Sequence, residues 1–148
     1  MAEFNSRKFL ARLAGPADGP QLELLAMDND FWFDGLHIDW ADVSPYWIVI
    51  DHEGDIVAGC QVCPSKPVGR IEILMMDSRL KQKSRAAAFS MMVRTSRELL
   101  KAQGVQIISG LIPKEMPEYL NFLTDRGWVN DYTCDVLFLG LRDGKKEE

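Results

Sequence analysis

A short basic segment, residues 81–86, is the part of the sequence best suited to bind a charged ligand. It brings Lys81, Lys83 and Arg85 together directly before a pattern typical of a helix. The start of a helix offers unpaired backbone N–H groups and the positive end of the helix dipole, which together favour an anion. The segment therefore predicts an anion site or, with equal weight, a solvated basic loop at the start of a helix.

Cysteine and metal chemistry is a weaker prospect. Cys60 and Cys63 have the C-x-x-C spacing, but three steps along a strand point the two thiols to opposite faces. A structural zinc site takes four ligands, and the chain has only 2 histidines. With Cys134 the cysteine count is odd, and no export signal precedes it, so we expect reduced thiols and no metal.

The composition is that of one globular domain. The chain has 148 residues, 47% of them hydrophobic and 26% charged, with a net charge of −5 that provides no general basic field for nucleic acid. It contains no apolar run near the roughly 18 residues that span a bilayer, and no signal peptide. We therefore expect a single domain at residues 1–143, a charged frayed tail at 144–148 and a cytoplasmic location, with neither nucleic acid nor a membrane as partner.

A strand, a helix and a second strand surround the basic segment. Residues 70–76 are apolar at nearly every position, as in a strand covered on both faces. The apolar residues from Phe89 to Leu100 share one helix face, and Gly104 predicts a helix end near Gln103. A second strand follows at residues 105–108, which completes a βαβ unit.

The remaining elements follow from shorter patterns. Residues 46–50 and 56–62 predict a hairpin, and residues 8–13 a first strand. Residues 28–45 mix aromatic and acidic side chains, which predicts either a helical segment of the core or the wall of an acceptor site. Further elements are expected as a short helix at 21–27, a helix after residue 117 that ends at Gly127, and strands at 128–129 and 133–141.

This order of elements resembles that of the GNAT superfamily of acetyl-CoA-dependent N-acyltransferases. Residues 46–59 resemble the second and third strands of that family, and residues 126–128, Arg-Gly-Trp, are similar to the Gly-aromatic step that ends its last helix. A weaker resemblance links the chain to GNAT-like proteins encoded by tailed phages. In full the resemblance covers residues 46–128; before them only the element order matches.

The basic segment carries the third match. The family's Arg/Gln-x-x-Gly-x-Gly/Ala motif falls on residues 81–86, where Lys81 replaces Arg or Gln, Ser84 replaces the first Gly and Ala86 fits. A register shifted by one residue stays open; its motif positions are Gln82, Arg85 and Ala87.

The resemblance implies a fold and a cofactor. The fold is α/β (α+β mixed), with a mixed, mostly antiparallel sheet of six to seven strands and a central splayed parallel βαβ pair, flanked by helices. The co-substrate is acetyl-CoA, whose pantetheine arm pairs with the end of strand 70–76 while the turn holds the pyrophosphate. The cofactor-binding positions so implied are Met76, Lys81, Gln82, Lys83, Ser84, Arg85 and Ala86.

The catalytic positions depart from the family pattern. Many members carry a Tyr, the proton donor to the leaving thiolate, where this chain has Leu123, and an Asn where it has Met116. Tyr119, one turn before Leu123, is either a substitute donor or a core tyrosine with a satisfied hydroxyl. Glu72 is the candidate general base, because a carboxylate among apolar neighbours should have a raised pKa; alternatively it faces solvent or pairs with Arg70.

Two functions follow from the resemblance. The first is an enzyme that moves an acetyl group from acetyl-CoA to a primary amine, on a small molecule or a protein, by direct attack in a ternary complex. The alternative is a GNAT-fold binding module with weak or no catalysis that acts on a protein partner. The acceptor and the oligomeric state, including a homodimer, stay open.

Overall fold

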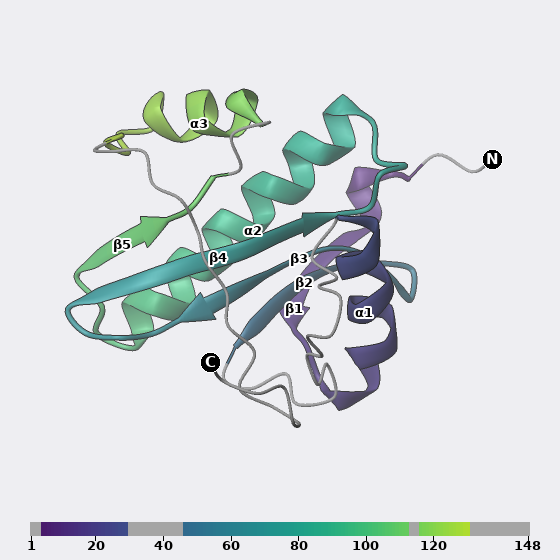
Figure 1. The fold of residues 1–148 in the computed structure, drawn as a ribbon, viewed down its shortest axis with the longest axis horizontal. Helices are drawn as coiled ribbons and strands as arrows, with labels where there is room; N and C mark the ends of the chain where they lie inside the picture. Colours follow the sequence, from purple (N-terminus) through teal and green to yellow (C-terminus); the bar gives the residue numbers. More distant parts are fainter. Residues whose placement is uncertain (1–3, 30–45, 113–115, 131–148) are drawn as a thin grey trace, which may run out of the picture.

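The computed structural model describes residues 4–29, 46–112 and 116–130. In these residues five strands form one sheet, with helices on both of its faces (Figure 1). The strands are β1 (Phe9–Leu13), β2 (Trp47–His52), β3 (Asp55–Cys63), β4 (Val68–Met76) and β5 (Ile107–Gly110). The helices are α1 (Gly19–Asp28), α2 (Gln82–Ala102) and α3 (Pro117–Thr124), with short 3₁₀ turns at Ser6–Lys8 and Pro16–Asp18.

The sheet has the predicted mixed topology. Its strands lie in chain order, antiparallel from β1 to β4 and parallel between β4 and β5. β4, α2 and β5 therefore form the predicted βαβ unit, and β2 and β3 form the predicted hairpin. The described residues contain five strands rather than six to seven, and the strand expected at residues 133–141 lies outside them.

The strand expected at residues 128–129 is not formed in the described part of the chain. The backbone N–H of Trp128 donates to the carbonyl of Leu123 (3.1 Å), and Gly127 has a φ of 93° that reverses the chain. These are features of a helix C-terminus, so the backbone group that a strand would have used closes α3 instead.

The start of α2 also differs from the prediction. The segment at residues 81–86 was expected to be a turn before the helix, but α2 begins at Gln82. Its first helical hydrogen bond runs from the N–H of Arg85 to the carbonyl of Lys81 (2.8 Å). The basic side chains of this segment therefore project from the first turn of the helix itself.

A bulge bends β4 away from β5. Between two paired positions, β3 contributes only Cys60 while β4 contributes Ile73 and Leu74, and Ile73 has a φ of 52°. An extra residue of this kind kinks a strand and interrupts its ladder. Pairing between β4 and β5 ends at Ile71 and Gly110, just before the bulge. The two parallel strands therefore separate beyond this point, as in the splayed pair that the resemblance implied.

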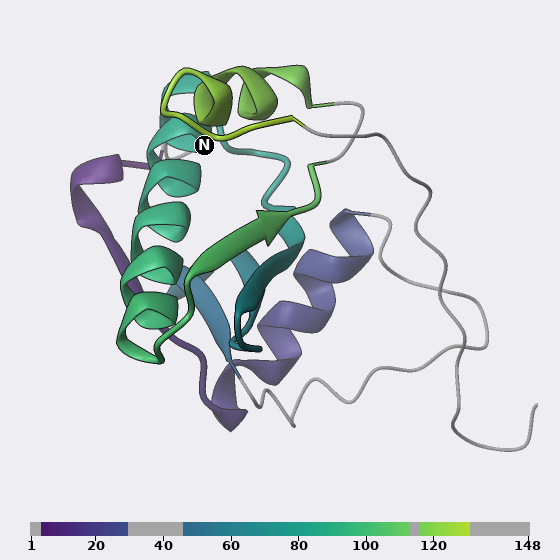
Figure 2. The same ribbon diagram turned by 90° about the vertical axis from the view of Figure 1, so that its left-hand side faces the viewer.

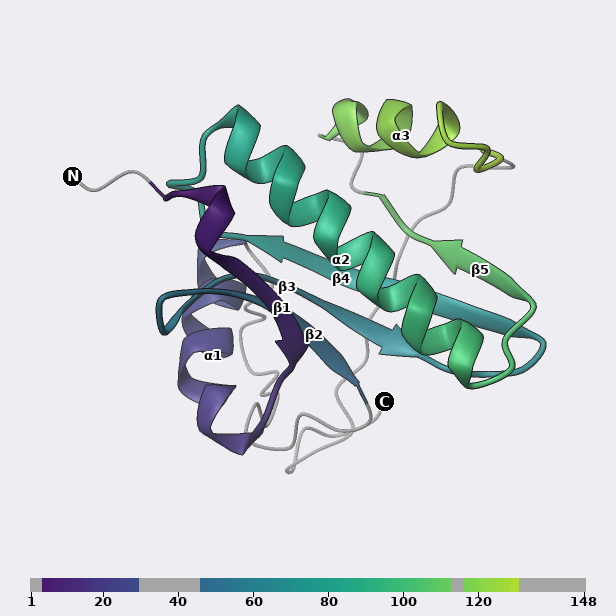
Figure 3. The ribbon, with the colours of Figure 1, turned by 180° about the vertical axis from the view of Figure 1, so that it is seen from behind.

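Two apolar cores lie on the two sides of the sheet. Figure 2 shows the sheet between α2 and α1, and Figure 3 shows α2 crossing the face opposite α1. The larger core joins the sheet to α2 and α3, whereas the smaller core joins it to α1. Side chains of β4 after the bulge alternate between them: Leu74 and Met76 lie in the larger core and Met75 in the smaller one.

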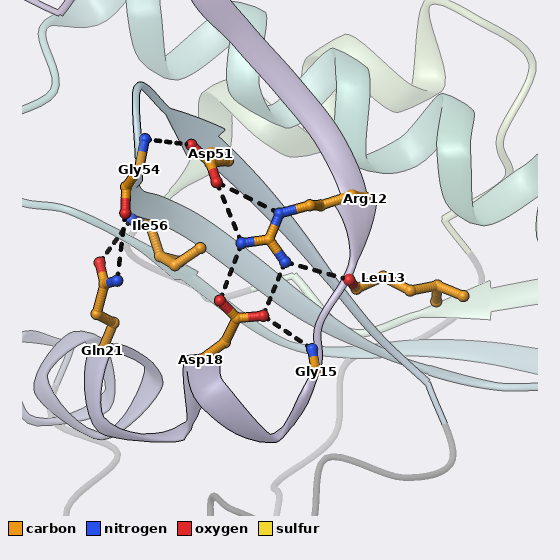
Figure 4. Close-up of polar contacts among 8 residues, drawn as sticks. All are labelled: Arg12, Leu13, Gly15, Asp18, Gln21, Asp51, Gly54 and Ile56. Atoms are coloured by element: carbon orange, nitrogen blue, oxygen red, sulfur yellow. Dashed lines mark hydrogen bonds and ion pairs between the residues drawn. The ribbon is translucent and has the colours of Figure 1, made fainter.

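A polar network fixes the N-terminal end of α1. The guanidinium of Arg12 in β1 donates to both carboxylate oxygens of Asp18 (2.7 and 2.9 Å) and to Asp51 in β2 (3.1 Å), as Figure 4 shows. The hydrogen bonds from Arg12 hold the pKa of the Asp18 carboxyl below its usual range, against the opposing effect of burial. One turn into the helix, the amide of Gln21 accepts from the N–H of Ile56 (2.8 Å) and donates to the hairpin loop.

Candidate functional site

The start of α2 has the features expected of an anion site. Lys81 is the N-cap residue, with extended backbone, and makes no side-chain capping hydrogen bond within the described chain. Lys81, Gln82 and Lys83 are exposed, and Ser84 and Arg85 are half-buried. The backbone N–H groups of this first turn lie at the helix end that favours negative charge.

The N-terminal segment lies against this turn. The hydroxyl of Ser84 donates to the carbonyl of Phe4 (3.2 Å), and the guanidinium of Arg79 lies 5.1 Å from the centre of the Phe4 ring. The ring of Phe4 also packs edge-on against His52 at 5.2 Å. Residue 84, where the family usually has glycine, thus uses its hydroxyl to hold a neighbouring segment.

Arg85 connects the start of α2 to α3. Its Nε donates to the hydroxyl of Tyr119 (3.2 Å), and that hydroxyl donates to the sulfur of Met76 (3.0 Å). Tyr119 is 3% exposed and stacks on Phe89 at 4.4 Å between ring centres. Burial raises the pKa of Tyr119, and Arg85 partly opposes this. Tyr119 is therefore a core tyrosine with a satisfied hydroxyl, placed at the end of β4.

The backbone of Met76 is held by a residue that sequence reasoning missed. The side-chain amide of Asn29, the C-cap residue of α1, accepts from the N–H of Met76 (3.0 Å) and donates to its carbonyl (2.8 Å). The only sequence signal for Asn29 is its type and its place just after a short helix, which favours a cap. Nothing in the sequence pattern points from there to a strand 47 residues away.

Apolar side chains line a cavity beside the point where β4 and β5 separate. The cavity there has a volume of about 20 Å³, which is room for roughly one water molecule and far too little for an extended ligand arm. Leu123 contributes to its wall, at the position where many family members carry a tyrosine. Burial raises the pKa of the Cys60 thiol, another wall residue, to about 12, so this sulfur stays protonated. Other residues that line the cavity include Ile71, Leu74, Phe89, Met92, Gly110 and Trp128.

Glu72 lies directly before the bulge. Its side chain is 26% exposed, and one carboxylate oxygen lies 3.6 Å from Nε of Arg70, two residues earlier on the same strand. The ion pair that the sequence allowed as an alternative is therefore present. Ile71 packs in the larger core, so the alternation of a strand places Glu72 on the face that carries α1. Tyr119 contacts β4 from the opposite face, and the two candidate catalytic residues do not share one side of the sheet.

The described residues contain no group of three or more His, Cys, Asp or Glu side chains placed to hold a metal ion. Cys60 is buried and Cys63 is half-buried, and both are free thiols. In the part of the chain that the structure covers, every helix is too short or too polar to cross a bilayer.

Comparison with solved structures identifies the fold. An aminoglycoside acetyltransferase from an uncultured soil metagenomic sample superposes with a TM-score of 0.66 at 15% identity, over 92% of this chain and 98% of that one. The aminoglycoside N-acetyltransferase AAC(6')-Iy in complex with CoA has a TM-score of 0.63 at 13% identity, over 90% and 95%. A protein described as a transcriptional regulator from Bacillus halodurans C-125 reaches 0.68 at 18% identity, over 88% and 99%.

The chain has the GNAT fold. No family model matches its sequence, and no curated protein sequence matches it either. The identities to these solved structures are low, so the likeness concerns the GNAT architecture. What this GNAT-fold protein does has to be argued from its own residues.

Proposed function

We propose that the protein is an acetyltransferase that moves an acetyl group from acetyl-CoA to a primary amine by direct attack in a ternary complex. The observation that carries this proposal is the start of α2, where the N–H groups of a helix N-terminus, Lys83 and Arg85 lie near the end of a splayed β4. In a chain with a net charge of −5, such a local basic site favours a ligand with several negative charges. The pyrophosphate of CoA has that chemistry.

The residues at the start of α2 fit the phosphate end of this cofactor. Lys83 is exposed and free to turn toward a phosphate, and the backbone N–H groups of Gln82, Lys83 and Ser84 point out of the helix end. Lys81 and Ala86 flank this first turn. The arm of the cofactor would pair with the outer edge of β4 at Met76, which here is bonded to Asn29.

Glu72 is the residue proposed to accept the proton of the attacking amine, directly or through water. A primary amine has a pKa near 10 in water, similar to that of lysine, so a base is needed to free its lone pair at neutral pH. Glu72 stands where β4 leaves β5, and Arg70 holds its carboxylate in place. An amine that reaches the bulge from the α1 face would meet this carboxylate first.

Departure of the CoA thiol depends less on acid–base catalysis than deprotonation of the amine does. A thiol of this kind has a pKa of about 8.5, so it can leave as a thiolate near neutral pH. The hydroxyl of Tyr119 donates its one proton to the sulfur of Met76, so it would have to turn away from that sulfur to donate to a leaving group beside β4. With Leu123 in the place of the usual donor, we expect a slow enzyme rather than an inactive one.

The acceptor is an amine, on a small molecule or on a protein. Some solved proteins of this fold are described as acetyltransferases of aminoglycosides, and one as a ribosomal-protein-alanine N-acetyltransferase from Brucella melitensis. Their acceptors differ in size and charge, so the fold itself does not select one.

Two observations favour the second candidate, a binding module with weak or no catalysis that acts on a protein partner. Leu123 replaces a common catalytic tyrosine, and the cavity beside β4 and β5 is too small for a ligand arm. A protein of the same fold described as a transcriptional regulator agrees with such a role.

Titration calorimetry with acetyl-CoA and with CoA tests the proposal. We expect both ligands to bind with a dissociation constant below ~1 mM. When a panel of primary amines is added to the acetyl-CoA complex, we expect release of free thiol. Binding without thiol release would support the binding module. Absence of heat and of a thermal shift at about 1 mM of either ligand would exclude the acetyltransferase.

A further inference from the structure

The outer edge of β4 at Met76 lies beyond the last pair of β4 and β5, where a ligand arm could use the strand for backbone pairing. The N–H of Asp77 donates to the carbonyl of Val57 in β3 (2.8 Å). Because peptide groups alternate along a strand, the N–H and carbonyl of Met76 point the other way, toward the side of β5. β5 no longer pairs there, since its last partner in β4 is Ile71.

Asn29 makes the hydrogen bonds to Met76 that a neighbouring strand would otherwise make. Its amide oxygen accepts from the N–H of Met76 (3.0 Å), and its Nδ2 donates to the carbonyl of Met76 (2.8 Å). The same Nδ2 donates to the carbonyl of Leu25 in the last turn of α1 (2.8 Å). The Asn29 amide thus pairs with both the N–H and the carbonyl of Met76. An amide group of an extended ligand would make the same pair of hydrogen bonds.

We propose that Asn29 is an intramolecular latch, which holds the backbone of Met76 in the place of the cofactor arm and must leave before an acyl-CoA can bind fully. This proposal rests on the proposed function, because it takes CoA as the ligand. In the latched state Lys83 is exposed at the phosphate end of the site while the edge of β4 is occupied. Binding of the arm and release of the end of α1 are therefore coupled.

The two ends of α1 differ in a way that permits release at one end. The N-terminal end is fixed by the paired charges of Arg12 and Asp18, of which the Asp18 side chain is only 11% exposed. At the C-terminal end, Asn29 is half-buried, and Asp28 is exposed where it accepts hydrogen bonds from the N–H (2.8 Å) and the hydroxyl (3.0 Å) of Ser78. Release of the last turn of α1 therefore requires the loss of hydrogen bonds made by Asn29 and Asp28, while the charge pair of Arg12 and Asp18 at the other end stays in place.

The neighbouring Asp28 supplies a matched control. Asn29→Ala removes both bonds to Met76, whereas Asp28→Ala removes two bonds from the same helix end without freeing the edge of β4. If Asn29 competes with the ligand, Asn29→Ala should bind CoA about five- to fifty-fold more tightly than the wild type, since two neutral hydrogen bonds no longer have to be broken. Asp28→Ala should bind CoA as the wild type does. Calorimetric titration of each folded protein with CoA measures the difference.

The outcomes separate the latch from the proposed function. Equal or weaker CoA binding by Asn29→Ala, with binding intact in the wild type, overturns the latch alone, and so does an equal gain in Asp28→Ala, which would indicate general loosening of α1. Binding only in Asn29→Ala supports a latch that is closed in the wild type. If neither protein binds CoA, the proposed function and the latch both fail.

A second measurement does not depend on a stable alanine variant. In nuclear magnetic resonance spectra of the wild type, addition of CoA should move the side-chain NH₂ signals of Asn29 toward solvent-exposed positions and speed their hydrogen exchange. Asn29→Ser, whose hydroxyl is too short to bridge both backbone groups of Met76, provides a further variant for the titration. Unchanged Asn29 signals at saturating CoA would overturn the latch.

Discussion

The two faces of the sheet are built by different means. The face under α2 and α3 is packed with apolar side chains around the buried hydroxyl of Tyr119. The face under α1 has a smaller core and is held at both ends of the helix by polar contacts, from Asp18 at one end and Asn29 at the other. Glu72 belongs to this second face.

The difference indicates how the proposed chemistry is divided. The residues proposed to contact the cofactor, at the start of α2 and at Tyr119, lie on the α2 side, whereas Glu72, the proposed base, lies on the α1 side. The two sides meet only where the bulge at Ile73 separates β4 from β5. Apart from Asn29, whose bonds to Met76 compete with the cofactor arm, changes on the α1 side should therefore affect proton removal and anchoring. Changes on the α2 side should affect cofactor affinity.

The largest effect is expected from Glu72→Gln. The neutral amide cannot accept a proton, so kcat should fall by about 10²–10⁴-fold and the remaining rate should rise with pH as free amine accumulates. The measurement is the pH profile of kcat from about pH 6 to about pH 9 on a confirmed amine substrate. Glu98→Gln makes the same chemical change on an exposed part of α2 and should leave the profile unchanged.

Full activity of Glu72→Gln from about pH 6 to about pH 9 would exclude Glu72 as the base. The base would then have to be sought among the acidic side chains of residues 28–42 rather than on β4.

Reversing the charges at the start of α2 should weaken the cofactor complex well over tenfold. In the double variant Lys83→Glu with Arg85→Glu, two charge-assisted contacts worth ~1.5–3 kcal/mol each are replaced by repulsion. The double variant Arg94→Glu with Arg97→Glu makes the same change in net charge further along α2, where both side chains are exposed. Calorimetry with CoA compares the two pairs; equal affinities would place the phosphate site elsewhere.

On the α1 side, Arg12→Ala should lower the free energy of unfolding by about 1–3 kcal/mol, because it leaves the largely buried Asp18 carboxylate without its cation. The pKa of Asp18 is lowered in the folded state, so the pair stabilises the fold above the unfolded pKa of about 3.9, and this stabilisation is lost as the pH falls through the folded pKa. Urea unfolding at about pH 7 and about pH 3 should therefore show a difference between wild type and variant that shrinks in acid.

The exposed pair of Lys8 and Glu53 is the control for this experiment. Lys8→Ala should change the free energy of unfolding very little at either pH, since exposed ion pairs contribute about 0–1 kcal/mol. An equally small effect of Arg12→Ala would show that the network in Figure 4 is not what anchors α1.

The smallest effect is expected from Tyr119→Phe. The phenyl ring keeps its stacking on Phe89, and only the hydroxyl between Arg85 and Met76 is lost, so kcat should fall a few-fold. Tyr46→Phe removes a hydroxyl elsewhere and should not change kcat. A loss for Tyr119→Phe as large as that for Glu72→Gln would make proton donation, rather than proton removal, the limiting contribution.

Local patterns in the sequence were enough to predict most of the elements. The hairpin, β4, α2 and β5 follow from apolar periodicity and from end signals such as Gly104, and all of these act within a few residues. The pairing of Glu72 with Arg70 was one of two local alternatives, because residues two apart on a strand share a face. The strand predicted at residues 128–129 was wrong, because the same residues could also close a helix.

Contacts between distant residues were decided only by the tertiary structure. The bulge at Ile73 depends on how β3 and β4 align, and the bond from Arg85 to Tyr119 joins residues 34 apart. Asn29 meets Met76 across 47 residues, because α1 and β4 end at the same corner of the sheet. A sequence pattern records which groups need a partner, but distant groups are paired only when the packing of the two cores brings their elements together.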